Sequence, residues 1–354
     1  MSTENSNIKK ILILQTAFIG DVILTLPLIQ EVKEFFPNTE VHFVTIPVSK
    51  NIVETHPQIS ALHIFDKRGE DRGISGLFNF AAKLRKQSFD IALVPHRSLR
   101  SALLVYLAGI PRRIGFNQSA GFYLLTERVK YKQYIHESER NLHLLKAIRS
   151  EYSPAKVLPV ISPDNEDIGI VSEWLYTNFK KEQNNIIALA PGSVWPTKRW
   201  PAEYWGTLAD FLIEKKYQVV LIGGKKDEYL LDLIGSMMKN RGIKSAFGLF
   251  SLRQSAELIR RCRLLISNDS APTHMGVAVK TPVLTIFGPT IPAFGFYPYG
   301  RFDRIAEKRD LNCRPCSIHG GNKCPRKHFR CMLELKPDLV FKIAMEMLSE
   351  DHKN

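Results

Sequence analysis

The stretch from 268 to 290, NDSAPTHMGVAVKTPVLTIFGPT, contains residue types that could bind an anion. Asp269 and Ser270 are typical helix caps, and Pro272 suits the first turn of a helix. The free backbone N–H groups and the positive end of the helix dipole at such a start attract a phosphate. Taken alone, this stretch is equally compatible with an ordinary, well-capped helix that leads into a buried strand.

A carboxylate at Asp21 could act as a general base. It follows an apolar run at 11–14 and opens a helical pattern at 21–36. Its side chain would therefore project from the carboxyl edge of a parallel sheet, where open α/β proteins bind ligands. The alternative role for Asp21 is that of a helix cap.

Two loops of the second half could hold a nucleotide. The segment APGSVWPTKRWP offers the small residues Gly192 and Ser193, which let a ligand approach the backbone, and Lys198, a point charge for a phosphate. The later segment GGKKDE places Asp227 at the same edge, where an acid can bind ribose hydroxyls. Asp227 could instead only favour the start of its own helix.

The surrounding pattern predicts the elements that position these residues. Apolar runs of strand length alternate with helical patterns in each half, which is typical of parallel sheets covered by helices on both faces. The expected strands are 11–14, 41–46, 61–65, 91–94, 186–190, 217–222, 264–267 and 283–287. The expected helices are 21–36, 76–87, 98–108, 201–215, 227–239 and 251–262.

A segment rich in proline and acid at 156–167 interrupts the alternation and is interpreted as a linker. We therefore expect an α/β protein of two Rossmann-like domains that face each other across a cleft, the architecture called GT-B. The expected domains are 1–160 and 161–335. In the remaining segment, 336–354, an apolar helix at 337–349 could pack back on the first domain.

The formal net charge of +14 predicts an anionic partner. Nucleic acid, a phosphorylated small molecule and an acidic membrane surface all qualify. The chain has no nucleic-acid recognition motif, so we expect no nucleic acid. Its polar start, MSTENSNIKK, lacks the apolar core of a signal peptide, and no apolar run reaches membrane-spanning length. We therefore expect a cytoplasmic location.

Four of the five cysteines lie in one segment, CRPCSIHGGNKCPRKHFRC. Cysteines so spaced in a cytoplasmic protein are more often metal ligands than disulfides, although the spacing is not that of a standard zinc ribbon. A structural zinc and unliganded thiols are the two leading interpretations, and a disulfide or an iron–sulfur cluster is a third. The four residues are Cys313, Cys316, Cys324 and Cys331.

Four ordered segments resemble the glycosyltransferase family 9 heptosyltransferases of lipopolysaccharide synthesis. They are ILILQTAFIGDVILTLPLIQEVKEFFP, APGSVWPTKRWP, LIGGKKDE and the stretch from 268 to 290. The resemblance implies transfer of L-glycero-D-manno-heptose from ADP-heptose, with inversion, to the Kdo/heptose inner core of a lipid A-linked acceptor. It makes the first domain the acceptor-binding one and the second the nucleotide-sugar-binding one.

The resemblance also implies roles for single residues. Asp21 would deprotonate the acceptor hydroxyl, and Lys198 would neutralise the departing diphosphate. Asp227 would hold the ribose. The sequence has Ala271 where the family commonly has glycine. The implied donor-binding set is Ser193, Thr197, Asp227, Asp269, Ser270, Ala271, His274 and Thr290.

No Asp-x-Asp pair occurs in the sequence, so we expect no cofactor in catalysis. The basic cluster at 97–132 gains a use from the resemblance, because Kdo carboxylates and lipid A phosphates are anionic. Arg97, Arg100 and Arg113 are the expected acceptor-binding residues. The acceptor would be Kdo-lipid A or heptosyl-Kdo-lipid A, and the enzyme would associate peripherally with the anionic inner-membrane surface.

Three alternatives stay open. The enzyme could be a transferase of the same family that uses another nucleotide sugar or acceptor. It could be a sugar-nucleotide epimerase, which needs no acceptor. A binding module without turnover is the third alternative.

Overall fold

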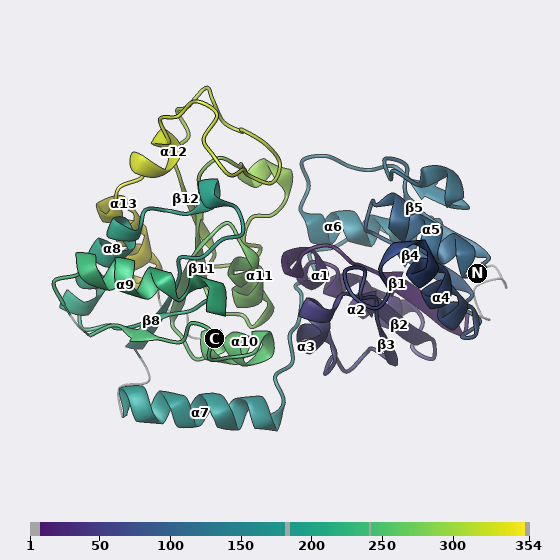
Figure 1. The fold of residues 1–354 in the computed structure, drawn as a ribbon, viewed down its shortest axis with the longest axis horizontal. Helices are drawn as coiled ribbons and strands as arrows, with labels where there is room; N and C mark the ends of the chain where they lie inside the picture. The colour runs from purple at the N-terminus through teal and green to yellow at the C-terminus, as the bar shows by residue number, and fades with distance from the viewer. Residues whose placement is uncertain (1–7, 181–184, 241, 351–354) are drawn as a thin grey trace. The chain divides into compact units, whose positions relative to one another are not determined.

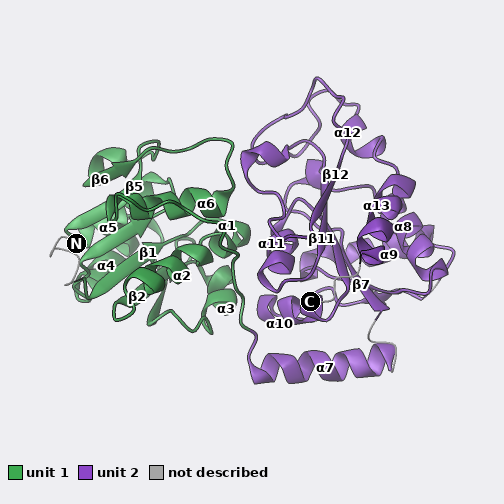
Figure 2. Cartoon of the chain, turned by 180° about the vertical axis from the view of Figure 1, so that it is seen from behind, with its two compact units in different colours: residues 1–162 green, residues 163–354 purple. Residues whose placement is uncertain are grey.

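The computed structural model describes residues 8–180, 185–240 and 242–350 (Figure 1). Its contacts divide the chain into two compact units, residues 1–162 and 163–354 (Figure 2). The division lies inside the linker expected at 156–167. Each unit builds its own six-stranded sheet, and every strand pairing in both sheets is parallel.

The sheet of the first unit has the order β3-β2-β1-β4-β5-β6. The order reverses between β1 and β4, which makes the carboxyl ends of these two strands a topological switch point. The strands are β1 (Lys10–Leu14), β2 (Glu40–Thr45), β3 (Ala61–Ile64), β4 (Ile91–Val94), β5 (Arg112–Phe116) and β6 (Glu127–Val129). The helices are α1 (Ile19–Ile23), α2 (Leu26–Phe35), α3 (Lys50–Val53), α4 (Gly73–Arg85), α5 (Leu99–Leu107) and α6 (Glu137–Leu142), with 3-10 turns η2 (Pro47–Ser49), η3 (Phe122–Leu124) and η4 (His143–Ala147).

The second unit repeats this topology in the order β12-β11-β10-β7-β8-β9, with its switch point between β7 and β10. The strands are β7 (Ile186–Ala190), β8 (Gln218–Leu221), β9 (Lys244–Ser245), β10 (Leu264–Asn268), β11 (Val283–Phe287) and β12 (Arg304–Glu307). The helices are α7 (Asn165–Phe179), α8 (Ala202–Glu214), α9 (Tyr229–Met237), α10 (Leu252–Arg260), α11 (Ala271–Ala278), α12 (Arg330–Leu333) and α13 (Pro337–Ser349), with η6 (Pro196–Lys198), η7 (Lys225–Asp227) and η8 (Pro292–Phe294).

The helix expected at 21–36 is divided in the structure. α1 ends at Ile23, and α2 begins at Leu26 with Pro27 in its first turn. Proline has no backbone N–H, and its ring collides with the carbonyl four residues earlier, so one continuous helix cannot pass through Pro27. The short α1 is therefore a separate element that carries Asp21.

The apolar face of the last helix, α13, packs on the core of the second unit. Val340, Ala344, Met347 and Leu348 repeat at helical spacing and are buried in the same core cluster of the second unit as Trp205. Its apolar face is therefore used within the second unit. Among the helices that the structure describes, none combines the length and apolar character needed to cross a bilayer.

Candidate active site

The loops after β7 and β10 meet at the switch point of the second sheet. Asn268, the last residue of β10, is fully buried; its Nδ2 donates to the Pro191 carbonyl (2.8 Å) and its Oδ1 accepts from the Trp200 backbone N–H (3.2 Å). A buried amide satisfied on both sides locks the loop that carries Lys198 against the start of α11. This positioning role of Asn268 is not evident from the sequence.

Three of the predicted donor-side residues converge beside this amide. Lys198 Nζ lies 2.6 Å from Asp269 Oδ2, and the Thr290 hydroxyl donates to the same oxygen at 2.7 Å. The Lys198 and Asp269 side chains are only 12% and 6% exposed. Burying two charges costs desolvation free energy, and this cost is offset only when the pair has good geometry and further hydrogen bonds, such as the one from Thr290. The pair gives an anion such as a diphosphate a fixed cation to approach.

His274 lies on α11 and is buried against the same pair. Burial lowers the pKa of His274 to about 4 against the opposing effect of the Asp269 carboxylate, with a smaller contribution from the Lys198 cation. The imidazole is therefore neutral at pH 7. It can donate or accept a hydrogen bond, but it does not supply positive charge to a phosphate.

The start of α11 differs from the capping predicted from the sequence. Ser270 occupies the N-cap position, yet its side chain accepts no bond from the helix. Its hydroxyl donates instead toward the carbonyls of Asn268 (3.2 Å) and Gly192 (3.4 Å). Ala271 is the first helical residue, a position that suits alanine, so the departure from glycine costs little there.

Asp227 has the capping role that the sequence allowed, and its contact with a ribose stays a prediction. Its Oδ2 accepts from the Gly224 N–H at 3.0 Å, so it caps η7. The same carboxylate fills space over two glycines: a Cβ on Gly192 would lie 2.6 Å from Asp227 Cγ, and one on Gly223 would lie 2.9 Å from Asp227 Oδ2. These glycines let the carboxylate sit where β7 and β8 end, beside Ser193.

Thr197, expected on the donor side, contacts the cysteine-rich loop. Its hydroxyl accepts from the Gly321 N–H (2.8 Å), and its backbone N–H donates to the Gly321 carbonyl (3.1 Å). A Cβ on Gly320 would lie 3.2 Å from Lys198 Cγ. Thr197 therefore docks the cysteine-rich loop against η6 and positions Lys198.

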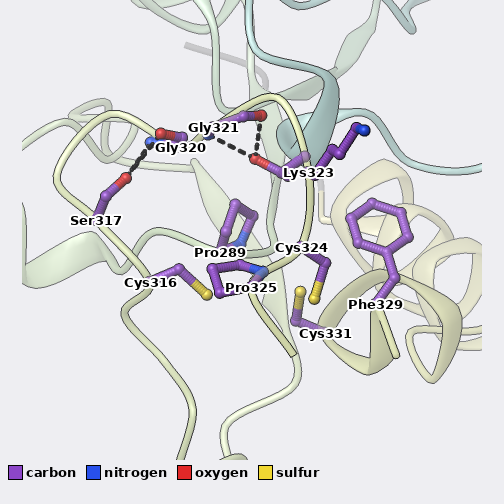
Figure 3. A pocket seen from close by; sticks show the side chains of 11 residues that line it. Pro289, Cys316, Ser317, Gly320, Gly321, Lys323, Cys324, Pro325, Phe329 and Cys331 are labelled. Atoms are coloured by element: carbon purple, nitrogen blue, oxygen red, sulfur yellow. Dashed lines mark hydrogen bonds between the residues drawn. The ribbon is translucent and has the colours of Figure 1, made fainter. Parts of the chain in front are cut away.

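The docked loop forms a pocket of about 90 Å³ (Figure 3). Pro289 and Phe329 line it together with three of the cysteines, and the Cys316 backbone N–H donates to the Pro289 carbonyl (2.8 Å). Cys324 and Cys331 are two of these cysteines, and both are drawn in Figure 3. The pocket thus adjoins the loop that carries Thr290.

All five cysteines are free thiols. Cys313 Sγ lies 3.8 Å from His328 Nε2. Burial raises the pKa of Cys331 to about 11 and also raises that of Cys316. Among the residues that the structure describes, no three His, Cys, Asp or Glu side chains are arranged as metal ligands. The predicted zinc shell is therefore not assembled in this structure.

In the first unit, Asp21 lies on α1, just after the carboxyl end of β1. Its Oδ2 accepts from the Phe18 N–H at 3.2 Å, so the capping role holds. The Thr25 hydroxyl donates to the Asp21 carbonyl (2.8 Å) and accepts from Gln15 (3.2 Å) and from Asn141 (3.4 Å). This buried polar network fixes the turn that presents Asp21.

Three residues that sequence reasoning missed meet at the same sheet edge. Thr16, Lys67 and His96 follow β1, β3 and β4. His96 Nδ1 lies 3.0 Å from the Thr16 hydroxyl and 2.8 Å from that of Ser101, and Lys67 Nζ donates to the Thr16 carbonyl (2.6 Å). Burial lowers the pKa of His96 to about 4 and also lowers that of Lys67. Position directly after a strand was the signal that could have found them.

The three expected acceptor-binding arginines do not lie together. The Arg97 guanidinium lies over the Tyr131 ring (4.3 Å), and Arg100 donates to the Gly73 carbonyl (2.9 Å), both following β4. Arg113 lies at the opposite, amino end of β5, where Nε donates to the Leu124 carbonyl at 2.8 Å. Arg113 therefore lies away from the sheet edge that Arg97 and Arg100 follow.

Known proteins are similar to this chain in sequence and in fold. The model of glycosyltransferase family 9 (heptosyltransferase) matches residues 77–323, well over half of the chain. The chain belongs to this family. It is 25% identical over 352 residues to lipooligosaccharide heptosyltransferase 2 of Haemophilus influenzae, covering 96% of this chain and 99% of that protein.

The fold of this family 9 glycosyltransferase matches two solved structures over nearly their whole lengths. The ADP-heptose lps heptosyltransferase II of E. coli gives a TM-score of 0.80 at 22% identity, covering 97% of this chain and 100% of that chain. The E. coli heptosyltransferase WaaC with ADP gives 0.73 at 19% identity, covering 96% and 99%. The GT-B class and an enzyme of the glycosyltransferase type, both predicted from the sequence, are confirmed.

Proposed function

We propose that this glycosyltransferase moves L-glycero-D-manno-heptose from ADP-heptose to the Kdo/heptose inner core of lipopolysaccharide, with inversion at the anomeric carbon. The observation that carries the donor side is the Lys198–Asp269 ion pair at the start of α11, with Thr290 on the same oxygen. Support comes also from the curated relative named a heptosyltransferase and from the structural neighbour solved with ADP.

On the donor side, the diphosphate of ADP-heptose would approach Lys198 and the uncapped N–H groups of α11. Charge accumulates on the ADP as the sugar leaves, and a fixed cation stabilises it without a metal. Asp227 would hold the ribose hydroxyls. Neutral His274 would serve as a hydrogen-bonding partner for heptose hydroxyls or phosphate oxygens.

On the acceptor side, Asp21 would take the proton of the acceptor hydroxyl. The hydroxyl oxygen would then bond to the anomeric carbon as the bond between that carbon and ADP breaks. The hydroxyl attacks from the face opposite the leaving group, which inverts the centre. Arg97 and Arg100 would bind the acidic groups of the acceptor. Lys67 adds a third cation at the same edge.

A donor panel tests the proposal. Purified enzyme is offered ADP-heptose, UDP-sugars and ADP-glucose, each with a Kdo-bearing and a heptosylated acceptor, and products are read by mass spectrometry. We expect transfer from ADP-heptose alone. Transfer only from another nucleotide sugar would contradict the donor assignment, and conversion of ADP-heptose without any acceptor would indicate an epimerase.

As a separate proposal, the cysteine cluster binds a structural zinc ion. The 3.8 Å between Cys313 Sγ and His328 Nε2 is compatible with two ligands of one ion, since Zn–S and Zn–N distances are about 2.3 and 2.1 Å. Elemental analysis of the purified protein tests it. We expect bound zinc that Cys313→Ser releases; metal-free protein with full stability would contradict the proposal.

A cytoplasmic enzyme attached peripherally to the inner membrane completes the proposal. A lipid A-linked acceptor stays anchored in the bilayer, so its sugar is available only near the lipid surface. The net charge of +14 favours an anionic membrane.

A further inference from the structure

Helix α5 is apolar on the side that should be polar. Leu99 and Tyr106 are exposed and Leu103 is half-buried, and their spacing of four and three residues places them on one face. The opposite side of the helix, with Leu104 and Val105, is buried in the core of the first unit. An ordinary surface helix carries charges on its outer face, and α5 carries only Arg100.

Neighbouring elements extend this surface. Helix α4, which packs beside α5, exposes Ile74 (76%) and Phe78 (52%) one turn apart (Figure 1). Turn η3 exposes Tyr123 (63%), and its preceding Gly121 lies so close to α5 that a Cβ there would be 3.2 Å from Leu99 Cδ1. We call the surface of Ile74, Phe78, Leu99, Tyr106, Phe122 and Tyr123 the apolar face.

The charge around the apolar face is almost all positive. From 72 to 126 the chain has eight lysines and arginines and a single acid, Asp90. The Asp90 carboxylate accepts the backbone N–H groups of Lys9 and Lys10 at 2.7 and 2.8 Å, at the amino end of β1. It therefore does not neutralise the face.

Cations sit directly against its rings. The Arg128 guanidinium lies 5.9 Å from the Phe122 ring centre, and that of Arg113 lies 5.5 Å from the Tyr106 ring centre. Arg100, on α5, donates to the Gly73 carbonyl at the start of α4. Aromatic and aliphatic side chains ringed by arginine are the composition of a surface that lies in the headgroup region of an anionic bilayer.

We propose that the apolar face docks this enzyme on a bilayer of anionic phospholipid. The inference rests on the proposed function, which it deepens by naming the surface that meets the membrane. A second copy of the chain is a poorer occupant, because a two-fold contact would press two net-positive surfaces together. Arg100 lies on α5 next to Leu99 of this face and also belongs to the proposed acceptor set, so docking would hold the acceptor edge of the first unit at the lipid surface.

Helix α9 provides a matched comparison. It also exposes an apolar stripe, Tyr229, Leu233 and Met237, at helical spacing. The segment around it, 225–239, has three lysines and three acids and no net charge. Apolar exposure is thus similar at the two places, and only the apolar face has the matching charge.

The test is co-sedimentation with vesicles of phosphatidylcholine mixed with phosphatidylglycerol, against phosphatidylcholine alone, at low salt. We expect the wild type to bind the anionic vesicles and Ile74→Ser/Phe78→Ser to bind about tenfold more weakly. Leu233→Ser/Met237→Ser replaces two exposed apolar side chains of α9, which are 45% and 55% exposed, and should bind like the wild type. Equal binding by the α4 variant, equal loss in the α9 variant, or no binding by the wild type would overturn the proposal.

Two further readouts separate the possible failures. Transfer to a Kdo oligosaccharide without lipid should be unchanged in Ile74→Ser/Phe78→Ser. If the wild type binds vesicles but transfers no heptose, the proposed function is refuted and the docking surface is still supported. Gel filtration of the wild type and this variant should show the same size. A wild-type dimer that the variant loses would assign the face to a second copy instead.

Discussion

The loops after β1 and after β7 occupy equivalent places in two sheets of the same strand order, yet they carry opposite chemistry. After β7, the cation Lys198 is buried together with an anion, Asp269, which follows the neighbouring strand β10. After β1, the part-buried Asp21 caps its own short helix, at the edge where Lys67, Arg97 and His96 also gather. Topology determines where each candidate site forms, and the roles proposed for the two sites, leaving-group binding and proton removal, depend on the side chains placed there.

The largest effect is expected from Asp21→Asn. Asparagine keeps the size and the capping oxygen but is not a base, so the transfer rate should fall by about 10²- to 10⁴-fold. ADP affinity, a property of the second unit, should not change. Rate measurements and calorimetry on the same preparations check this. If Asp21→Asn loses both the transfer rate and the ADP affinity, the two loops do not have the separate roles proposed here.

Lys198→Met should weaken ADP binding by about ten- to a hundredfold, measured by calorimetry. It should also lower the free energy of unfolding by about 3 kcal/mol, because Asp269 is left buried without its partner. The double variant Lys198→Met/Asp269→Asn should recover most of that stability in denaturant titration but not the ADP affinity. Recovered affinity would show that Lys198 only neutralises Asp269.

A smaller effect is expected from Gly192→Ala, since the new Cβ would lie 2.6 Å from Asp227 Cγ and force the carboxylate to move. We expect the ADP dissociation constant to rise by a few-fold to about tenfold, as for one weakened hydrogen bond. Gly235→Ala is the control, because a Cβ there has nothing within 4 Å. An unchanged constant for Gly192→Ala would remove Asp227 from the donor site.

The smallest expected effect is a difference between the two units in their stability at acidic pH. Burial lowers the pKa of four histidines in the first unit to about 4, and of one, His274, in the second. Between pH 6.5 and 4 the unfolded chain binds protons that the folded chain does not, so the free energy of unfolding falls as the pH falls. The first unit should therefore unfold at the higher pH. The four histidines are His56, His63, His96 and His143.

The tryptophans make this order measurable, since all four lie in the second unit, at 174, 195, 200 and 205. Tryptophan fluorescence then follows the second unit, and far-ultraviolet circular dichroism follows both. We expect the dichroism to change first on acidification. Coincident transitions would mean that the two units unfold together.

Much of this fold could be predicted from the sequence, because central parallel strands are continuous apolar runs such as Ile11–Leu14 and Ile186–Ala190. The strands that were not expected lack such runs. β5 begins with two arginines, and β9 consists of Lys244 and Ser245 at the edge of its sheet. Their pairing depends on neighbours that the local sequence does not reveal.

The site was predictable one residue at a time but not as pairs. Lys198, Asp269 and Asp227 each follow a strand, and that position indicated a role. The contact between Lys198 and Asp269 depends on β7 and β10 being neighbours, which is a property of the strand order. His96 and Thr16 were missed for the same reason, since they meet only once β1 and β4 pair.

One measurement tests the central claim most directly: the anomeric configuration and yield of product from ADP-heptose and a Kdo-bearing acceptor, followed by nuclear magnetic resonance for the wild type and Asp21→Asn. We expect the wild type to form one inverted heptosyl linkage and an equal amount of ADP, and Asp21→Asn to form almost none while still binding ADP. Wild-type yield from Asp21→Asn, or a retained configuration, would contradict a mechanism in which Asp21 is the base of an inverting transfer.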